Sequence, residues 1–155
     1  MTRACAGSSA GLLAGVAALS LRGAELSATG LDALLSQHPC DDLLRLDLDD
    51  NPLGAAGLEA LARAKRLGGL RALGLARTGL ASGALEPLLR GPLLARLRRL
   101  DLTQNALTDD DLLRLLGHPT LSDGLWLGLA GNRVSPQFGA WAQRELGSRL
   151  RALVL

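Results

Sequence analysis

Length, composition and charge exclude several classes of function. The chain has 155 residues, of which 48% are apolar, and its formal net charge of +2 is too small to indicate a surface for nucleic acid or for an anionic membrane. Aromatic residues make up only 2% of the chain, which leaves little material for a base-stacking platform or an aromatic cage. No apolar run approaches the ~20 residues that a membrane-spanning helix needs.

A frame of eleven residues recurs along the chain and predicts its architecture. Apolar residues occupy positions 1, 4, 6 and 11 of the frame, and position 9 holds Asn or a small residue. Five frames follow one another every 27 residues and a sixth stops at Leu155; they begin at Val16, Leu43, Leu70, Leu97, Gly124 and Leu150. A unit of this length can bury its apolar side only against its neighbours, so the period predicts a stacked solenoid.

In chain order, each unit is predicted to contain a short strand and then a helix. Apolar residues at positions 4 and 6 give the period of two of a strand with one buried face, so positions 3, 5, 7 and 8 should face outward. After position 11 the apolar spacing becomes that of a helix. The strands should be parallel, because the same crossover follows each of them.

Residues at the predicted helix ends support this assignment. Ser27, Ser82 and Thr108 are plausible N-caps, and Pro136 suits an early helical position. Helix stops are expected at His38-Pro39, Gly68-Gly69, Gly91-Pro92 and His118-Pro119. In the fifth helix, Phe138 and Trp141 replace the usual pair of leucines, and we expect them to plug the last full layer.

The N-terminal segment and the cysteines bear on location. Arg3 followed by the apolar run from Gly11 to Leu21 could be a secretory signal, but the residues of this run also fit the first repeat, which is the favoured interpretation. Cys5 and Cys40 are isolated thiols, which are typical of a reducing compartment, and a cytoplasmic protein is predicted.

The repeat resembles the leucine-rich repeat family and is most similar to its ribonuclease-inhibitor-like subclass, over roughly residues 16–155. The resemblance implies an α/β solenoid, a right-handed superhelix with a curved parallel sheet on its concave side and helices on its convex side. The predicted organisation is a single domain, 1–155, of five full repeats plus a terminal strand. In this family the Asn at position 9 bonds backbone groups of neighbouring turns, so Asn51, Asn105 and Asn132 should form a ladder; Thr78 is a partial substitute, and at Ala24 the ladder should be absent.

The outward positions of the strands supply the candidate site. At position 5, two aspartates alternate with glycines, and Arg lies at position 3 of the same two strands. The predicted protein-binding residues are Arg45, Asp47, Asp49, Asp50, Arg77, Arg99, Asp101 and Trp126. They could grip a basic loop of a partner, with Trp126 as an exposed anchor. Alternatively, Arg45 with Asp47 and Arg99 with Asp101 are only solvated ion pairs.

Metal binding and catalysis find little support in the sequence. Asp47, Asp49 and Asp50 could suggest calcium by their number, but no Gly-rich ligand loop follows them. His38 and His118 lie three units apart, make no metal site with the thiols, and are interpreted as helix-stop residues. No nucleophile and base can be assembled and no phosphate loop occurs, so no enzyme activity, metal or cofactor is predicted.

The expected function is therefore a non-catalytic protein–protein interaction module. Two alternatives remain: a regulator of a small GTPase, similar to Ran-type GTPase-activating proteins, and a repeat segment of a larger sensor of the NOD-like-receptor type. Leu153 and Leu155 end a strand without its own helix, so we expect a partner, a second copy or a continuation of the chain to cover this edge.

Overall fold

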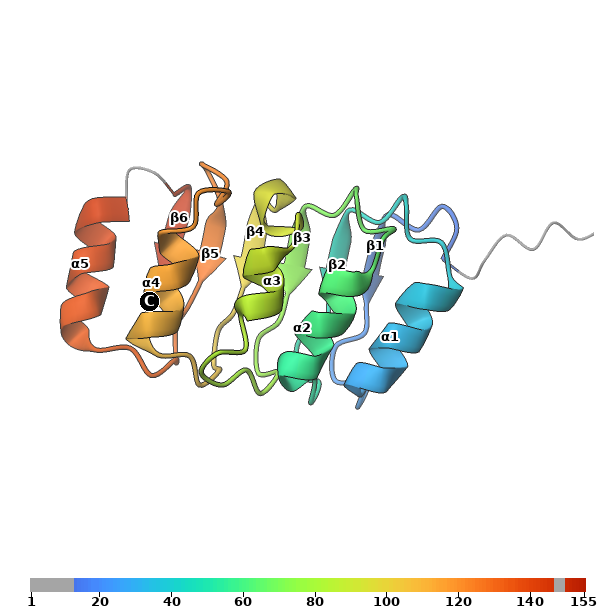
Figure 1. The fold of residues 1–155 in the computed structure, drawn as a ribbon, viewed down its shortest axis with the longest axis horizontal. Coiled ribbons are helices and arrows are strands. Elements are labelled where there is room, and N and C mark those ends of the chain that lie inside the picture. The colour runs from blue at the N-terminus through green and yellow to red at the C-terminus, as the bar shows by residue number, and fades with distance from the viewer. Residues whose placement is uncertain (1–12, 147–149) are drawn as a thin grey trace, which may run out of the picture.

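The described part of the chain folds into one curved, parallel sheet with helices on one face (Figure 1). The structure is a computed structural model and describes residues 13–146 and 150–155. Within these residues it has six strands, paired in chain order: β1 (Ala18–Ser20), β2 (Arg45–Asp47), β3 (Ala72–Gly74), β4 (Arg99–Asp101), β5 (Trp126–Gly128) and β6 (Ala152–Val154). The predicted α/β solenoid is confirmed.

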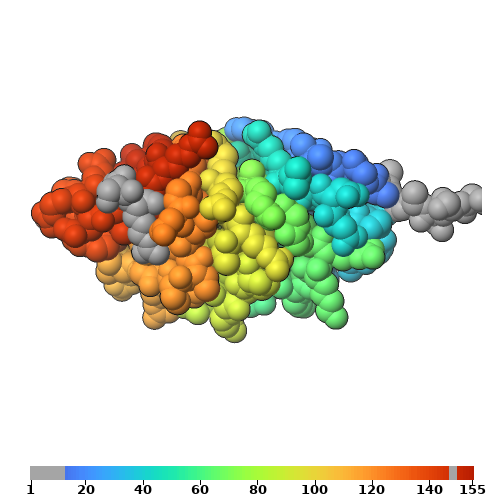
Figure 2. Space-filling model, turned by 90° about the horizontal axis from the view of Figure 1, so that it is seen from above, coloured from blue at the N-terminus to red at the C-terminus, as the bar shows by residue number. Residues whose placement is uncertain are grey.

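The register of the sheet follows the sequence frame. Residues at position 4 of successive units stand opposite one another, from Leu19 on β1 to Leu153 on β6. On the four inner strands this leucine is at most 1% exposed, because the helices cover it. The units therefore stack side by side along the long axis, as Figure 2 shows by its continuous change of colour from blue to red.

The helices vary more than the strands. They are α1 (Ala28–Gln37), α2 (Gly54–Arg63), α3 (Glu86–Arg90), α4 (Asp109–Leu116) and α5 (Pro136–Leu146), with a 3₁₀ turn, η1 (Leu94–Arg96), after α3. All five α-helices lie on the same face of the sheet in Figure 1, which leaves the other face of the sheet uncovered by helices.

Two of the predicted N-caps are confirmed. The Ser27 hydroxyl accepts a bond from the Gly30 N–H at 3.1 Å at the start of α1. At the start of α4, the Asp111 carboxylate accepts the Thr108 N–H at 2.9 Å and the Thr108 hydroxyl at 2.7 Å. This pair forms a capping box, in which cap and third residue satisfy each other.

The cap predicted at Ser82 is wrong. Helix α3 begins only at Glu86 and has five residues. Gly83 adopts a left-handed φ of +80°, which a helix cannot contain, and its N–H donates to Asp111 of the next unit at 2.7 Å. The third unit therefore replaces the first helical turn with a loop that is bonded to its neighbour.

The asparagine ladder is confirmed at the three predicted positions. The Asn105 amide donates to the carbonyls of Leu75 and Leu102 at 2.9 and 3.0 Å, and its oxygen accepts the Leu80 N–H at 3.0 Å. Asn51 and Asn132 make corresponding bonds. The Thr78 hydroxyl donates only to Leu75 of its own turn at 2.7 Å, so Thr78 is the partial substitute that was predicted.

Aromatic side chains close the last helical layer. Pro136 is the first residue of α5, and Phe138 is buried against the core. The Trp141 ring lies beside it, with the two ring centroids 5.5 Å apart, and also packs on the core. Both side chains thus occupy the place of the usual leucine pair.

Candidate functional site

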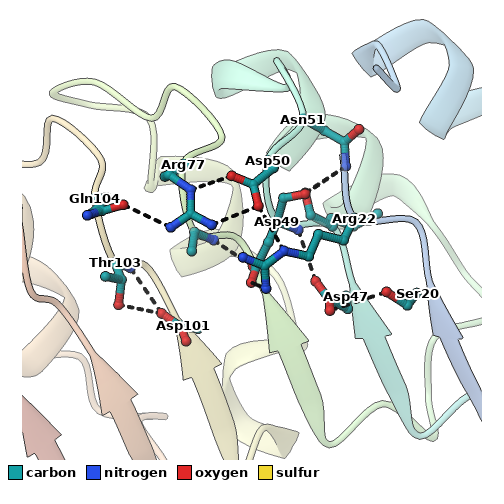
Figure 3. A network of polar contacts seen from close by, with 12 residues as sticks. Ser20, Arg22, Asp47, Asp49, Asp50, Asn51, Arg77, Asp101, Thr103 and Gln104 are labelled. Carbon is teal, nitrogen blue, oxygen red and sulfur yellow. Dashed lines mark hydrogen bonds and ion pairs between the residues drawn. The ribbon is translucent and has the colours of Figure 1, made fainter. Parts of the chain in front are cut away.

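The open face of the sheet carries a connected network of polar side chains at the ends of β2, β3 and β4 (Figure 3). Asp47 Oδ1 accepts the N–H of Asp49 at 3.1 Å, and Asp101 Oδ1 accepts the N–H of Thr103 at the same distance. The Thr103 hydroxyl adds a second bond to Asp101 at 2.6 Å. One oxygen of each aspartate is therefore engaged by its own strand, while the other oxygen faces Ser20 in the case of Asp47 and Arg99 in the case of Asp101.

The alternation of aspartate and glycine at position 5 has a structural cause. A Cβ atom on Gly74 would lie 3.2 Å from Asp47 Oδ1 and 2.8 Å from Asp49 Oδ1. A Cβ on Gly128 would lie 2.8 Å from Asp101 Oδ1. The carboxylates of one unit thus lean over the glycine of the next unit, where no side chain fits beneath them.

This arrangement leaves a shallow hollow of about 190 Å³ above Gly74. Its charged walls combine three carboxylates with three guanidinium groups, on Asp47, Asp49, Asp101, Arg22, Arg45 and Arg99. Since Gly74 has no side chain, the hollow has a backbone floor between two charged strands. Its size suits the end of one side chain rather than a small-molecule ligand.

Asp49 is a partly buried acid of the hollow. Its side chain is 13% exposed, its Oδ1 accepts the Ala76 N–H at 2.8 Å, and Arg22 lies 3.6 Å from its Oδ2. Burial raises the pKa of Asp49 above its ordinary value; the charges of Asp47 and Asp101 act in the same direction, while the Ala76 bond and Arg22 oppose them. A cation brought into the hollow would relieve this unfavourable environment.

A second row of side chains lies beside the hollow, at position 8. This position adopts a left-handed φ in all five full units: at Gly23, Asp50, Arg77, Gln104 and Gly131. The shared conformation aligns neighbouring side chains, so the Arg77 guanidinium donates both to Asp50 Oδ2 at 2.7 Å and to Gln104 Oε1 at 2.8 Å. Arg22 approaches Asp50 at 2.9 Å from the other side.

This row is electrostatically self-satisfied. The hydrogen bond from Arg77 lowers the pKa of Asp50 below its ordinary value, and the same bond raises the pKa of Arg77. Asp50 and Arg77 therefore bind each other, and the row at position 8 fixes the loops that follow β2, β3 and β4.

Trp126 differs from the exposed anchor that the sequence predicted. Its side chain is half-buried, because the Arg99 guanidinium lies 3.5 Å above its ring centroid. The ring also extends over its own strand, where a Cβ on Gly128 would approach Cη2 to 2.9 Å. Trp126 is therefore partly covered by the chain itself. The cation–π contact holds the Arg99 guanidinium over the Trp126 ring.

The two predicted same-strand ion pairs have different outcomes. Arg99 lies 3.7 Å from Asp101, both partly exposed. Among the residues that the structure describes, Arg45 forms no ion pair with Asp47, whose Oδ2 instead accepts the Ser20 hydroxyl at 3.3 Å.

The structure groups the predicted residues in three places. Five of them line the hollow: Arg45, Asp47, Asp49, Arg99 and Asp101. Asp50 and Arg77 bind each other in the row at position 8, and Trp126 lies under the Arg99 guanidinium. The prediction omitted Arg22, Thr103 and Gln104, although they occupy the same frame positions, 7 and 8, as Asp49 and Asp50.

Among the described residues, no group of three or more His, Cys, Asp or Glu side chains is arranged to hold a metal ion. Asp47 and Asp49 each turn an oxygen toward a backbone N–H instead. The two histidines lie after helix ends, as predicted: His38 caps α1, and His118 follows Gly117, the cap of α4. The His118 ring bonds Thr120 at 2.9 Å. The buried Nδ1 of His38 has no hydrogen-bond partner among the described atoms.

The fold and this polar face define a solenoid repeat protein with an open sheet. A family model described as Leucine Rich repeat matches residues 41–62 and 96–116, which lie mainly in the second and fourth units. These two matches and the register of the sheet support membership of the leucine-rich repeat family. No curated protein matches the chain. No helix within the described ranges is long and apolar enough to span a membrane.

Proposed function

We propose that the chain is a non-catalytic protein-interaction module that binds its partner on the open sheet face and the loops at its rim. Leucine-rich repeats generally mediate protein–protein interaction. The observation that carries the proposal is the hollow above Gly74, because it gathers five of the predicted binding residues around one opening. The 27-residue spacing, with a helix in each full unit, supports the ribonuclease-inhibitor-like subclass.

The hollow is suited to a basic side chain of the partner. The carboxylates of Asp47, Asp49 and Asp101 can surround an ammonium or guanidinium group, which would compete with the weak contacts that Ser20 and Arg99 make to Asp47 and Asp101. Charge-assisted hydrogen bonds of this kind are about twice as strong as neutral ones. Arg45 and Arg99 also line the opening, where they would repel a basic group that entered beside them.

Affinity capture with paired variants tests this proposal. In Asp47→Asn with Asp101→Asn, each side chain can still accept its backbone N–H, but the two charges are removed. Asp32→Asn on exposed helix α1 is the control for a loss of charge elsewhere. The wild-type chain and the control should capture the same proteins from a lysate of the source cells, as measured by mass spectrometry, and the double variant should lose them.

Circular dichroism should establish that the double variant keeps its fold. If the folded double variant captures the same proteins as the wild type in the same amounts, the hollow is not the binding surface.

A further inference from the structure

A second hollow of about 370 Å³ lies at the other end of the strands. Its lining consists of Arg71, Ala72, Arg98, Arg99, Trp126 and Arg151. Four of these six residues carry a guanidinium group and none carries a carboxylate. It meets the first hollow at Ala72 and Arg99, which line both.

The basic lining repeats with the frame. Arg71, Arg98 and Arg151 all occupy position 2, directly before the strands β3, β4 and β6, and all three are exposed. Leu125 interrupts this row, since it holds the same position before β5 and is fully buried. The sequence therefore places three arginines in a row across the starts of the strands, although position 2 was not among the positions predicted to face outward.

Two of these arginines are held in place by hydrogen bonds. Arg71 Nη1 donates to the carbonyls of Gly68 and Leu70 at 3.2 and 3.0 Å. Arg98 Nη1 donates to the Ser122 hydroxyl at 2.7 Å and to the Asp123 carbonyl at 3.3 Å. Because a guanidinium has five N–H donors, these bonds through one nitrogen orient each group and leave it able to bind an anion.

The length of the row indicates the shape of the ligand. Neighbouring strands lie about 4.8 Å apart, so the positions from β3 to β6 extend over roughly 14 Å. A single carboxylate or phosphate is much smaller than this distance. An extended peptide, which advances about 3.3 Å per residue, could place alternate side chains along the whole row.

From this geometry we infer that the hollow binds an extended acidic segment of a protein partner, with its carboxylates on Arg71, Arg98 and Arg151. The inference rests on the proposed function and adds the chemistry of the ligand at this end of the sheet. Arg99 can contribute a further donor, since it stacks on Trp126 at the border of the hollow. Arg–carboxylate pairs are frequently bidentate, which would fix the position of each carboxylate.

A labelled peptide tests the inference directly. The probe is a fluorescein-labelled peptide of ten residues in which glutamate alternates with serine, and its control has glutamine in place of glutamate. Binding to the full chain is measured by fluorescence anisotropy at low salt. The glutamate peptide should bind at least tenfold more tightly than the glutamine peptide, and Arg98→Gln or Arg151→Gln should each weaken its binding at least threefold.

Arg144→Gln is the matched control, because it removes an exposed positive charge on α5, outside the hollow. Equal binding of the two peptides, or an equal loss of affinity in Arg144→Gln and Arg151→Gln, would overturn the inference. So would tighter binding of a ten-nucleotide oligothymidylate than of the glutamate peptide. Arg151→Gln remains informative if Arg98→Gln does not fold, since Arg98 also holds the loop at Ser122.

The same assay separates this inference from the proposed function. The Asp47→Asn, Asp101→Asn chain keeps all the arginines of the basic hollow, so it should still bind the glutamate peptide. A wild-type chain that captures partners through Asp47 and Asp101 but does not bind the peptide would refute only the acidic-segment inference.

Discussion

At the scale of single residues, two partly buried aspartates experience opposite environments. Asp111 is 6% exposed, and burial alone would raise its pKa, but bonds from the N–H groups of Gly83 and Thr108 and from nearby hydroxyls lower the pKa below its ordinary value. Asp49 has one backbone donor, and burial dominates, so its pKa is raised. The donors around each carboxylate, together with the neighbouring charges of Asp47 and Asp101 at Asp49, decide which effect prevails.

We predict that Asp111→Asn destabilises the chain by about 1–3 kcal/mol at pH 7, because an amide cannot accept all the bonds that the carboxylate accepts. The stability that Asp111 contributes is present above its ordinary pKa and is lost as the pH falls through its lower folded value. Urea unfolding, followed by circular dichroism, should therefore show the gap between wild type and variant narrowing in acid. A gap that is unchanged between pH 7 and pH 3 would contradict this assignment.

For Asp49→Asn the expected sign is opposite. A raised pKa means that the ionised carboxylate is less favourable in the folded chain than in the unfolded chain, so this penalty is present at pH 7 and disappears as the pH falls toward the ordinary pKa. Asn can still accept the Ala76 N–H. The variant should unfold at a higher urea concentration than wild type at pH 7 and at a similar concentration in acid; a less stable variant at pH 7 would show that the ion pair with Arg22 dominates.

The residue scale also separates what the sequence could predict from what it could not. The bonds of Asn51, Asn105 and Asn132 were predictable, because they connect the side chain to backbone groups that every unit presents. The burial of Asp49 was not, since period-two alternation describes only one strand. It depends on the neighbouring unit, where Gly74 leaves room and Ala76 offers an N–H.

At the scale of elements, the strands were predicted more accurately than the helices. Every strand contains the predicted position 4, because one alternating apolar pattern fixes both the strand and its register. Helix α3 is short for a local reason, the left-handed conformation of Gly83. The helical spacing of this unit begins at Ala84, directly after the glycine, so periodicity and the cap predicted at Ser82 could not show that the helix starts only at Glu86.

Gly74 on β3 provides a test at this scale. Gly74→Ala should destabilise the chain by about 1–3 kcal/mol, since the added Cβ would meet Asp49 Oδ1 at 2.8 Å and this oxygen is fixed by Ala76. The substitution should also abolish partner capture, because it fills the floor of the hollow. Thermal unfolding and the capture assay measure the two effects.

The matched control is Gly139→Ala on α5, where the nearest atom to the added Cβ is at 3.6 Å. This variant should keep full capture and gain up to about 1 kcal/mol from its higher helix propensity. Equal stability of the two alanine variants would show that the carboxylates above Gly74 can move aside.

At the scale of the whole molecule, the carboxylates of the open face lie toward the strand ends. The hollow above Gly74 combines three carboxylates with three guanidinium groups, whereas the hollow at the strand starts contains arginines and no carboxylate. The two hollows share Ala72 and Arg99, so one partner could occupy both. Such a partner would need basic side chains toward the strand ends and acidic ones toward the strand starts, which would set its orientation.

The leaning of each aspartate over the next glycine also implies that the units are not interchangeable modules. Excision of residues 74–100 would remove one 27-residue period and place Asp47 directly opposite Asp101, with the two carboxylates about 4.8 Å apart on adjacent strands. Excision of residues 21–47 removes the same length but places Ser20 opposite Gly74.

Both shortened chains lose one unit, yet only the first should unfold at clearly lower urea concentration at pH 7 than its counterpart, and acid should reduce the difference. If the two chains are equally stable at neutral pH, neighbouring units tolerate any order. If the first chain is less stable, units can be inserted or removed without a loss of stability at position 5 only in pairs, one unit with aspartate and one with glycine.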